Sequence, residues 1–265
     1  MSFVERPGGC RIYYELAGDA AKPPLVLVRG LARSARYWGP LVPELAPAFR
    51  LLLLDNRGVG RSDTPRPPYT CGQLADDVIA VMDAANIDRA HLFGMSLGGM
   101  IAQHVALTHG ARIDRLVLGC TSPGGKRALQ PSLRTRLALL RSALDGTPER
   151  AVDRLMPILI ANATPELTKE LYELARVEPV RRRGLFGQLA AVVRHDVLDR
   201  LGSLDHRTLV VTGDADTLIP PGNSALLVNA IPGARLAVLP GARHDFTTDR
   251  PREVARLLRE FLLGD

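Results

Sequence analysis

A serine between two glycines is the residue of this chain best suited to act as a nucleophile. Residues 94–98 read Gly-Met-Ser-Leu-Gly, with Ser96 at the centre, between a short apolar run (90–93) and a run of helical periodicity (97–108). A serine on a sharp strand-to-helix turn has a strained backbone and an exposed hydroxyl. The helix that follows directs free N–H groups and the positive end of its dipole toward that hydroxyl. We therefore predict acyl transfer at Ser96, with a tightly packed turn or a phosphate cradle as the alternatives.

A serine hydroxyl needs a base to take its proton, and the chain has six histidines. In a parallel sheet, ligands bind beyond the carboxyl ends of the strands, so the base belongs in a loop that follows a strand. Only His244, directly after the expected strand 235–239, meets this condition. The other histidines lie at the amino end of a strand, on or just past the helix behind Ser96, or in a long helical segment: His91, His104, His109, His195 and His206.

Two aspartates compete to orient the imidazole of His244. Asp214 and Asp216 both lie in the loop after the expected strand 208–212. Spacing alone does not choose between them: one would hold His244 in the correct tautomer, and the other would brace the turn.

The elements that must position these residues alternate between strand and helix. This alternation of buried apolar strands with amphipathic helices predicts an α/β fold with a doubly wound, mainly parallel sheet. The expected strands are 10–15, 25–28, 50–54, 90–93, 116–118, 208–212 and 235–239, of which the first would pair at an edge. The expected helices are 38–46, 72–85, 97–108, 224–230 and one that follows Pro251.

The alternation stops after residue 120 and resumes at about 202. From Lys126 to about Leu201 the sequence has helical periodicity, divided by five prolines, and no strand candidate. We expect one core domain built from 1–120 and 202–265, with 121–201 as a helical cap insertion that shapes the substrate pocket.

Composition excludes several classes of protein. The net charge is +6, and residues 126–200 carry 14 basic and 9 acidic residues that alternate without interleaved aromatics, which argues against nucleic-acid binding. No apolar run approaches the roughly 18 residues of a membrane span, and the N-terminus lacks an apolar signal region, so we expect a cytoplasmic protein. The three cysteines have no paired spacing, so neither a disulfide framework nor a zinc site is indicated.

Four segments together resemble the α/β-hydrolase-fold enzymes: 55–62, 94–99, 213–216 and 241–244. The resemblance covers essentially the whole chain, follows the family order Ser, Asp, His, and is greatest to 3-oxoadipate enol-lactonases and small esterases. It implies that the acid is the aspartate of Gly-x-x-Asp, Asp216. It also implies that the oxyanion hole is formed by the backbone N–H groups of Leu31 and Leu97.

The resemblance has one clear departure. The family's oxyanion loop usually reads His-Gly-x, and here it reads Arg29-Gly30-Leu31. Arg29 and Gly30 are therefore candidate substrate-binding residues, with the alternative that Arg29 pairs with a local carboxylate. Together with the basic run 181–183, Arg29 predicts a preference for substrates that carry a carboxylate.

We expect a serine hydrolase that cleaves a small carboxylic ester or lactone through an acyl-enzyme, with no metal or organic cofactor. The expected partner is a small-molecule substrate, and a homo-oligomer is left open. Serine at position 96 argues against dehalogenases and epoxide hydrolases, whose nucleophile is a carboxylate. The alternatives on the same triad are a ligand receptor with slow turnover, a cofactor-free haloperoxidase or perhydrolase, and a C–C bond hydrolase.

Overall fold

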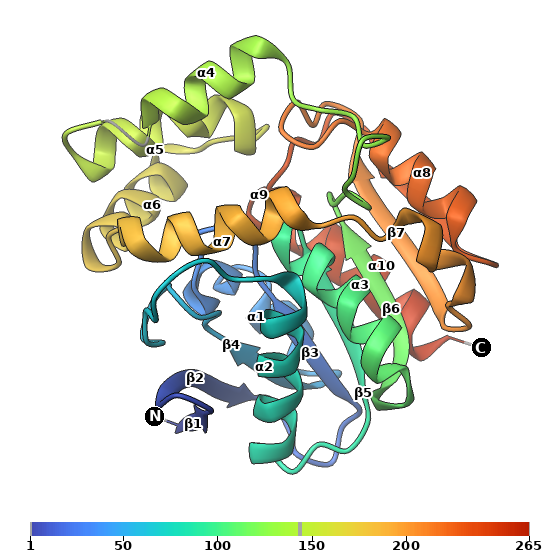
Figure 1. The fold of residues 1–265 in the computed structure, drawn as a ribbon. Helices are drawn as coiled ribbons and strands as arrows, with labels where there is room; N and C mark the ends of the chain where they lie inside the picture. The colour runs from blue at the N-terminus through green and yellow to red at the C-terminus, as the bar shows by residue number, and fades with distance from the viewer. Residues whose placement is uncertain (1, 143–144, 265) are drawn as a thin grey trace.

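An eight-stranded sheet organises the computed structural model, which describes residues 2–142 and 145–264 (Figure 1). The strand order is β1-β2-β4-β3-β5-β6-β7-β8; β1 and β2 pair antiparallel and the other six strands are parallel. The predicted fold class is confirmed. The strands are β1 (Ser2–Arg6), β2 (Cys10–Ala17), β3 (Pro24–Val28), β4 (Arg50–Leu54), β5 (Ala90–Met95), β6 (Ile113–Gly119), β7 (Arg207–Gly213) and β8 (Arg235–Leu239).

Helices cover both faces of the sheet and form two hydrophobic cores. In β3, Val26 packs into one core and its neighbours Leu25 and Leu27 pack into the other, because successive side chains of a strand point to opposite faces. One face is covered by α2 (Cys71–Ala84), α3 (Leu97–His109) and α8 (Gly222–Ala230). The other is covered by α1 (Val42–Leu45), α9 (Phe246–Asp249) and α10 (Pro251–Leu263).

Three local elements differ from the sequence-based expectation. β1 was not predicted; it forms a hairpin with β2 and is the edge strand in its place. The expected helix 38–46 is instead a 3₁₀ turn, η1 (Ala35–Trp38), followed by the short α1, which begins at Val42 and has Pro43 in its first turn. The short α9 directly after His244 was also missed.

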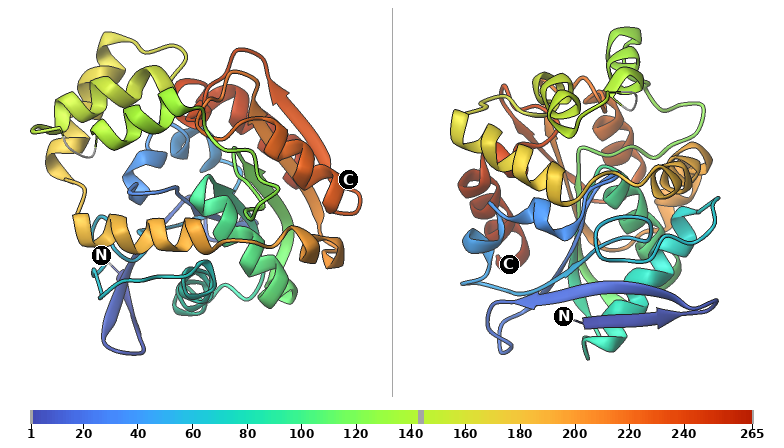
Figure 2. Two further views of the ribbon diagram at one scale, coloured as in Figure 1. Left: turned by 45° about the horizontal axis from the view of Figure 1, so that its top comes forward. Right: turned by 90° about the vertical axis from the view of Figure 1, so that its left-hand side faces the viewer.

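Four helices between β6 and β7, here called the cap segment, form a separate group of elements. They are α4 (Leu133–Ser142), α5 (Pro148–Leu159), α6 (Pro165–Val177) and α7 (Arg182–Arg194). In Figures 1 and 2, α4, α5 and α6 lie together away from the sheet, and α7 crosses between them and the core. The short η3 (Leu198–Ser203) leads from α7 back to β7. Among the described residues, no helix is long and apolar enough to cross a membrane.

Candidate active site

Ser96 lies on a strained turn between β5 and α3. Its φ of +57° and ψ of −120° are unfavourable for a residue with a side chain. The turn is possible because the backbone crowds two glycines: a Cβ at Gly94 would lie 2.1 Å from the carbonyl oxygen of Gly98, and one at Gly98 would lie 2.0 Å from that of Val28. The serine thereby lies at the N-terminus of α3, where the helix dipole favours negative charge.

His244 and Asp216 form a buried pair. His244 follows β8 and Asp216 follows β7, and the distance between His244 Nδ1 and Asp216 Oδ2 is 2.8 Å. The two residues are 5% and 3% exposed. The other carboxylate oxygen of Asp216 accepts hydrogen bonds from the backbone N–H groups of Leu218 (2.8 Å) and Ile219 (2.9 Å), which hold the carboxylate in place.

Asp214 has a different partner. Its side chain is exposed and accepts a hydrogen bond from the backbone N–H of Gly241 at 2.6 Å. It therefore ties the loop after β7 to the turn after β8, while Asp216 contacts the imidazole. The choice that spacing left open is made by the packing of these two loops.

The serine turn and the His244 loop meet at the end of β6. The backbone N–H of Ser96 donates to the carbonyl oxygen of Gly119 (2.9 Å), and the thiol of Cys120 donates to the carbonyl oxygen of His244 (3.1 Å).

No hydrogen bond joins the Ser96 hydroxyl to the His244 ring, although both residues are among those described. In hydrolases without bound substrate, such catalytic contacts are often long. Burial raises the pKa of the Cys120 thiol, which keeps it in its protonated form.

The loop after β3 lies directly against the serine. A Cβ at Gly30 would be 3.0 Å from Ser96 Cβ and 3.4 Å from Ser96 Oγ, so a larger residue there would press against the serine and displace it by a few tenths of an ångström. Among the described residues, the backbone N–H groups of Leu31 and Leu97 have no hydrogen-bond acceptor. Two free donors beside Ser96 are what an oxyanion hole requires.

Known proteins share this architecture over its full length. A family model described as the alpha/beta hydrolase fold matches residues 23–151. The chain is 31% identical to "Putative carbamate hydrolase RutD" of Caulobacter vibrioides, over 96% of each chain. The chain belongs to the α/β-hydrolase family. It is a hydrolase, as its named relatives are.

Solved structures of other α/β hydrolases are equally similar. A hydrolase from Pseudomonas aeruginosa has a TM-score of 0.85 and 31% identity, covering 100% of this chain and 98% of its own. The enol-lactonase from Burkholderia xenovorans has a TM-score of 0.85 and 26% identity, covering 97% and 98%. The predicted resemblance to the family is therefore confirmed.

Arg29 pairs with a local carboxylate, which is the alternative to substrate binding that the sequence left open. Its Nη2 lies 2.9 Å from both carboxylate oxygens of Asp245, and its Nη1 donates to the hydroxyl of Thr247 at 2.8 Å. The guanidinium also lies 4.5 Å from the ring centroid of Trp38, and the residue is 2% exposed. Arg29 is thus not offered to a substrate, because Asp245, adjacent to His244, neutralises its charge. Instead it joins the oxyanion loop to the His244 loop.

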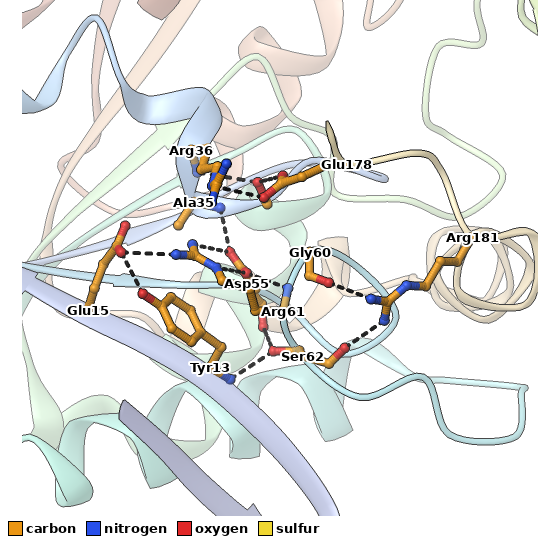
Figure 3. A network of polar contacts seen from close by, with 11 residues as sticks. Tyr13, Glu15, Ala35, Arg36, Asp55, Gly60, Arg61, Ser62, Glu178 and Arg181 are labelled. Atoms are coloured by element: carbon orange, nitrogen blue, oxygen red, sulfur yellow. Dashed lines mark hydrogen bonds and ion pairs between the residues drawn. The ribbon is translucent and has the colours of Figure 1, made fainter. Parts of the chain in front are cut away.

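Residues 55–62, one of the segments that resemble the family, support the neighbouring loop and contribute no reacting group (Figure 3). Asp55 is fully buried, and its carboxylate accepts hydrogen bonds from the backbone N–H groups of Ala35 (2.7 Å) and Arg61 (2.8 Å). The side chain of Arg61 also pairs with Asp55, at 3.0 Å from its Nε. These contacts hold the loop after β4 against the loop after β3, which contains Gly30 and Leu31.

Charged side chains in the link between α6 and α7 hold the cap segment against the core. Arg181 donates to the backbone carbonyl oxygens of Gly60 (2.8 Å) and Ser62 (3.0 Å), and Glu178 pairs with Arg36 at 3.1 Å (Figure 3). Arg181 therefore serves as an anchor between cap and core. The two following arginines, 182 and 183, are exposed.

Two residues that position the site were not found from the sequence. Gln188 of α7 is fully buried; its side chain accepts from the backbone N–H of Ala32 (2.9 Å) and donates to the carbonyl oxygen of Arg57 (3.0 Å). Asp245 is the buried partner of Arg29. A glutamine on a helix and an aspartate after a histidine have no local pattern that signals these contacts, although an arginine in the histidine position of the oxyanion loop does call for a carboxylate partner.

A small cavity lies between the cap segment and the loop after β3. Its polar lining residues are Arg33 and Asp245, and the rest of its lining is apolar side chains of α5 and α6 and the residue that follows α5: Val152, Leu155, Met156, Leu159, Ile160 and Leu171. The cavity adjoins the site through Asp245, the neighbour of His244. With a volume of about 20 Å³, the cavity holds no more than a single water molecule, so it is an apolar surface beside the loop after β3 and not a pocket that holds a substrate group.

Proposed function

We propose that this hydrolase cleaves small carboxylic esters or lactones through an acyl-enzyme on Ser96. The observation that carries the proposal is the strained Ser96 at the N-terminus of α3, at the same sheet edge as the buried His244–Asp216 pair. Named relatives support the substrate class: an enol-lactonase, and an enzyme described as degrading N-acyl homoserine lactone at 28% identity.

Each residue has a defined role in the proposed reaction. His244 takes the proton of the Ser96 hydroxyl, and Ser96 Oγ attacks the carbonyl carbon. The N–H groups of Leu31 and Leu97 stabilise the oxyanion of the tetrahedral intermediate. The intermediate collapses, the alcohol leaves with the proton from His244, and a water molecule activated by His244 then hydrolyses the acyl-enzyme. Asp216 holds the imidazole in the required tautomer throughout.

Carbamate hydrolysis is the second candidate, because the 31% identical relative from Caulobacter vibrioides is named for that reaction. The same serine attack would form a carbamoyl-enzyme in place of an acyl-enzyme. A matched pair of a phenyl ester and a phenyl carbamate separates the two, since the better substrate shows the higher kcat/KM.

The receptor alternative predicts one turnover per chain at most, whereas a hydrolase releases product continuously.

The test is Ser96→Ala with a short-chain chromogenic ester. Loss of the nucleophile is expected to lower kcat by about five to six orders of magnitude, as in other triad enzymes. Ser203→Ala, a change at an exposed serine of η3, is the matched control and should leave kcat unchanged. Residual activity of Ser96→Ala above about 1% would contradict the acyl-enzyme mechanism, because the residual rate of triad deletions is far lower.

A further inference from the structure

Three potential metal ligands lie together outside the catalytic site. Cys71 begins α2, His104 belongs to α3, and His195 directly follows α7. The thiol sulfur and one ring nitrogen of each histidine all lie within 4.8 Å of one another. Cys71 and His195 are buried, and His104 is half-buried.

The two histidines approach each other through one ring nitrogen each. His195 Nδ1 and His104 Nε2 are 3.3 Å apart. Two nitrogens bound to one zinc ion at 2.0–2.1 Å with a tetrahedral angle are also about 3.3 Å apart. The spacing of these nitrogens therefore suits one bound ion as well as it suits a hydrogen bond between the rings.

A second contact orients the His195 ring for this role. Its other nitrogen, Nε2, donates to the carbonyl oxygen of Ser122 at 3.1 Å. Histidines that bind metals in proteins characteristically donate their second N–H to a backbone carbonyl or carboxylate, which leaves the first nitrogen free as a ligand. The cluster thus has an outer-shell partner already in place.

The backbone of His195 is also held in position. Gly125 donates its N–H to the carbonyl oxygen of His195 (3.0 Å), and a Cβ at Gly124 would lie only 1.9 Å from that oxygen. Gly124 also pairs with Asp196 in an isolated bridge. The segment that leaves β6 and the segment that returns from α7 therefore meet at the cluster, and a preorganised ligand lowers the entropy cost of binding an ion.

We propose that Cys71, His104 and His195 bind one Zn²⁺ ion, with a water molecule as the fourth ligand. Two imidazoles and a thiolate suit zinc, which prefers four-coordinate nitrogen and sulfur sites. The ion would fasten the return from the cap segment to α2 and α3. This site is separate from the residues that carry the proposed hydrolysis.

In the absence of an ion, the thiol of Cys71 donates to the carbonyl oxygen of Ala191 at 3.5 Å. Metal ligands bind in their deprotonated form, so binding of an ion would replace this contact and release the thiol proton to the solvent.

Co²⁺ and Zn²⁺ titrations test the proposal. Cys120, Asp216 and His244 also hold ligand atoms within 4.8 Å of one another, so we would titrate the His244→Gln protein, in which that second cluster lacks its histidine. We expect one ion per chain, visible bands of tetrahedral Co²⁺, a thiolate-to-cobalt charge-transfer band, and release of about one proton per Zn²⁺ by calorimetry in two buffers.

Ligand variants in the same background complete the test. Cys71→Ser and His104→Gln should each weaken Zn²⁺ binding by more than about 100-fold, beyond the range typical of losing an outer-shell partner. Cys10→Ser, at a buried cysteine outside both clusters, should bind as the parent does. Circular dichroism without metal checks that each variant folds. Absence of the charge-transfer band in the parent, or tight binding that survives both substitutions, would overturn the proposal.

Discussion

At the residue scale, the two aspartates after β7 differ by two positions in the chain and have different partners. Asp216 contacts the His244 ring, and Asp214 contacts the backbone of Gly241. Their side chains also differ in burial, since Asp216 is 3% exposed and Asp214 lies at the surface. These differences make the pair a direct test of which carboxylate orients the imidazole.

We expect Asp216→Asn to lower kcat by about four orders of magnitude, as the equivalent change does in chymotrypsin-type enzymes. An amide cannot accept the Nδ1–H hydrogen bond as a carboxylate does, so the imidazole adopts the wrong tautomer. Asp214→Asn, the matched control, removes only the charge from a surface turn and should change kcat by less than about threefold, as is usual for surface substitutions. Steady-state kinetics with one ester measures both, and equal losses would contradict the assignment.

Protonation of His244 should set the acid limb of the pH profile. Burial by itself lowers the pKa of His244, but the hydrogen-bonded carboxylate of Asp216 raises it well above its ordinary value. Only the neutral ring accepts the Ser96 proton, so kcat/KM should rise with pH through a midpoint above about 6.5. A midpoint at or below that value would show that Asp216 does not control the ring.

The stability of the fold provides the control for this profile. A histidine whose pKa is raised by folding contributes its full stabilisation below the unfolded-state pKa and loses it as the pH rises through the folded-state pKa. The His244–Asp216 pair therefore does not weaken toward low pH through this histidine. Loss of activity between about pH 7 and 6 should leave the circular dichroism spectrum unchanged.

At the scale of elements, a buried ion pair joins two loops that follow β3 and β8. Arg29 and Asp245 are 216 residues apart in sequence, and both are buried. Removal of one partner leaves the other charge uncompensated in the interior. The charge of Arg29 lowers the pKa of Asp245 against the effect of burial, so the pair stabilises the fold above the unfolded-state pKa of about 4 and weakens only below it.

We expect Arg29→Met to lower the free energy of unfolding by about 3–5 kcal/mol at pH 7. Asp245→Asn should also destabilise the fold, and the double variant Arg29→Met/Asp245→Asn should be more stable than Arg29→Met alone, since no charge remains buried. Arg256→Met, which breaks an exposed pair with Glu260 on α10, is the control and should cost far less. Urea unfolding measures all four; equal losses for Arg29→Met and Arg256→Met would contradict the role of the buried pair.

At the scale of the whole molecule, the positive charge of the chain contributes little to the proposed site. Arg29 is neutralised by Asp245, and Arg181 donates to backbone carbonyls of the core. The small cavity bounded by Asp245 and Arg33 has an otherwise apolar lining, mostly from α5 and α6. The preference for carboxylate substrates that the sequence suggested is therefore not supported by Arg29 or Arg181, because both guanidinium groups already have partners in the protein.

We accordingly expect a neutral methyl ester to have a higher kcat/KM than the matched substrate with a free carboxylate. Apolar side chains of α5 and α6 stabilise a neutral group, whereas a carboxylate would lose its hydration beside Asp245 and would find only Arg33, whose guanidinium lies over the Tyr37 ring. The ratio of the two kcat/KM values should change little between low salt and about 0.15 M salt, because no exposed charge pair is involved. A faster carboxylate substrate with a salt-sensitive rate would show that an arginine faces the substrate.

Local patterns in the sequence predicted seven of the eight strands and the positions of two candidate site residues. Apolar runs and glycine spacing act over a few residues, so they predicted the six parallel strands, the Ser96 turn and the position of His244 after β8. They missed β1, whose outward-facing side chains have no strong apolar pattern, and α9, which is a single helical turn.

Contacts between distant segments were decided only by the tertiary structure. Spacing did not choose between Asp214 and Asp216, and the family resemblance implied Asp216; the contact of Asp216 with His244 follows from how the loops after β7 and β8 pack. Arg29 pairs with Asp245, and Cys71 lies near two histidines. In each case the partners are far apart in the sequence, so no rule based on residue spacing predicts the contact. The physical reason is common to all three: such a contact depends on where whole elements are placed by the packing of the two hydrophobic cores, and the types of the residues determine only what the contact can do once it forms.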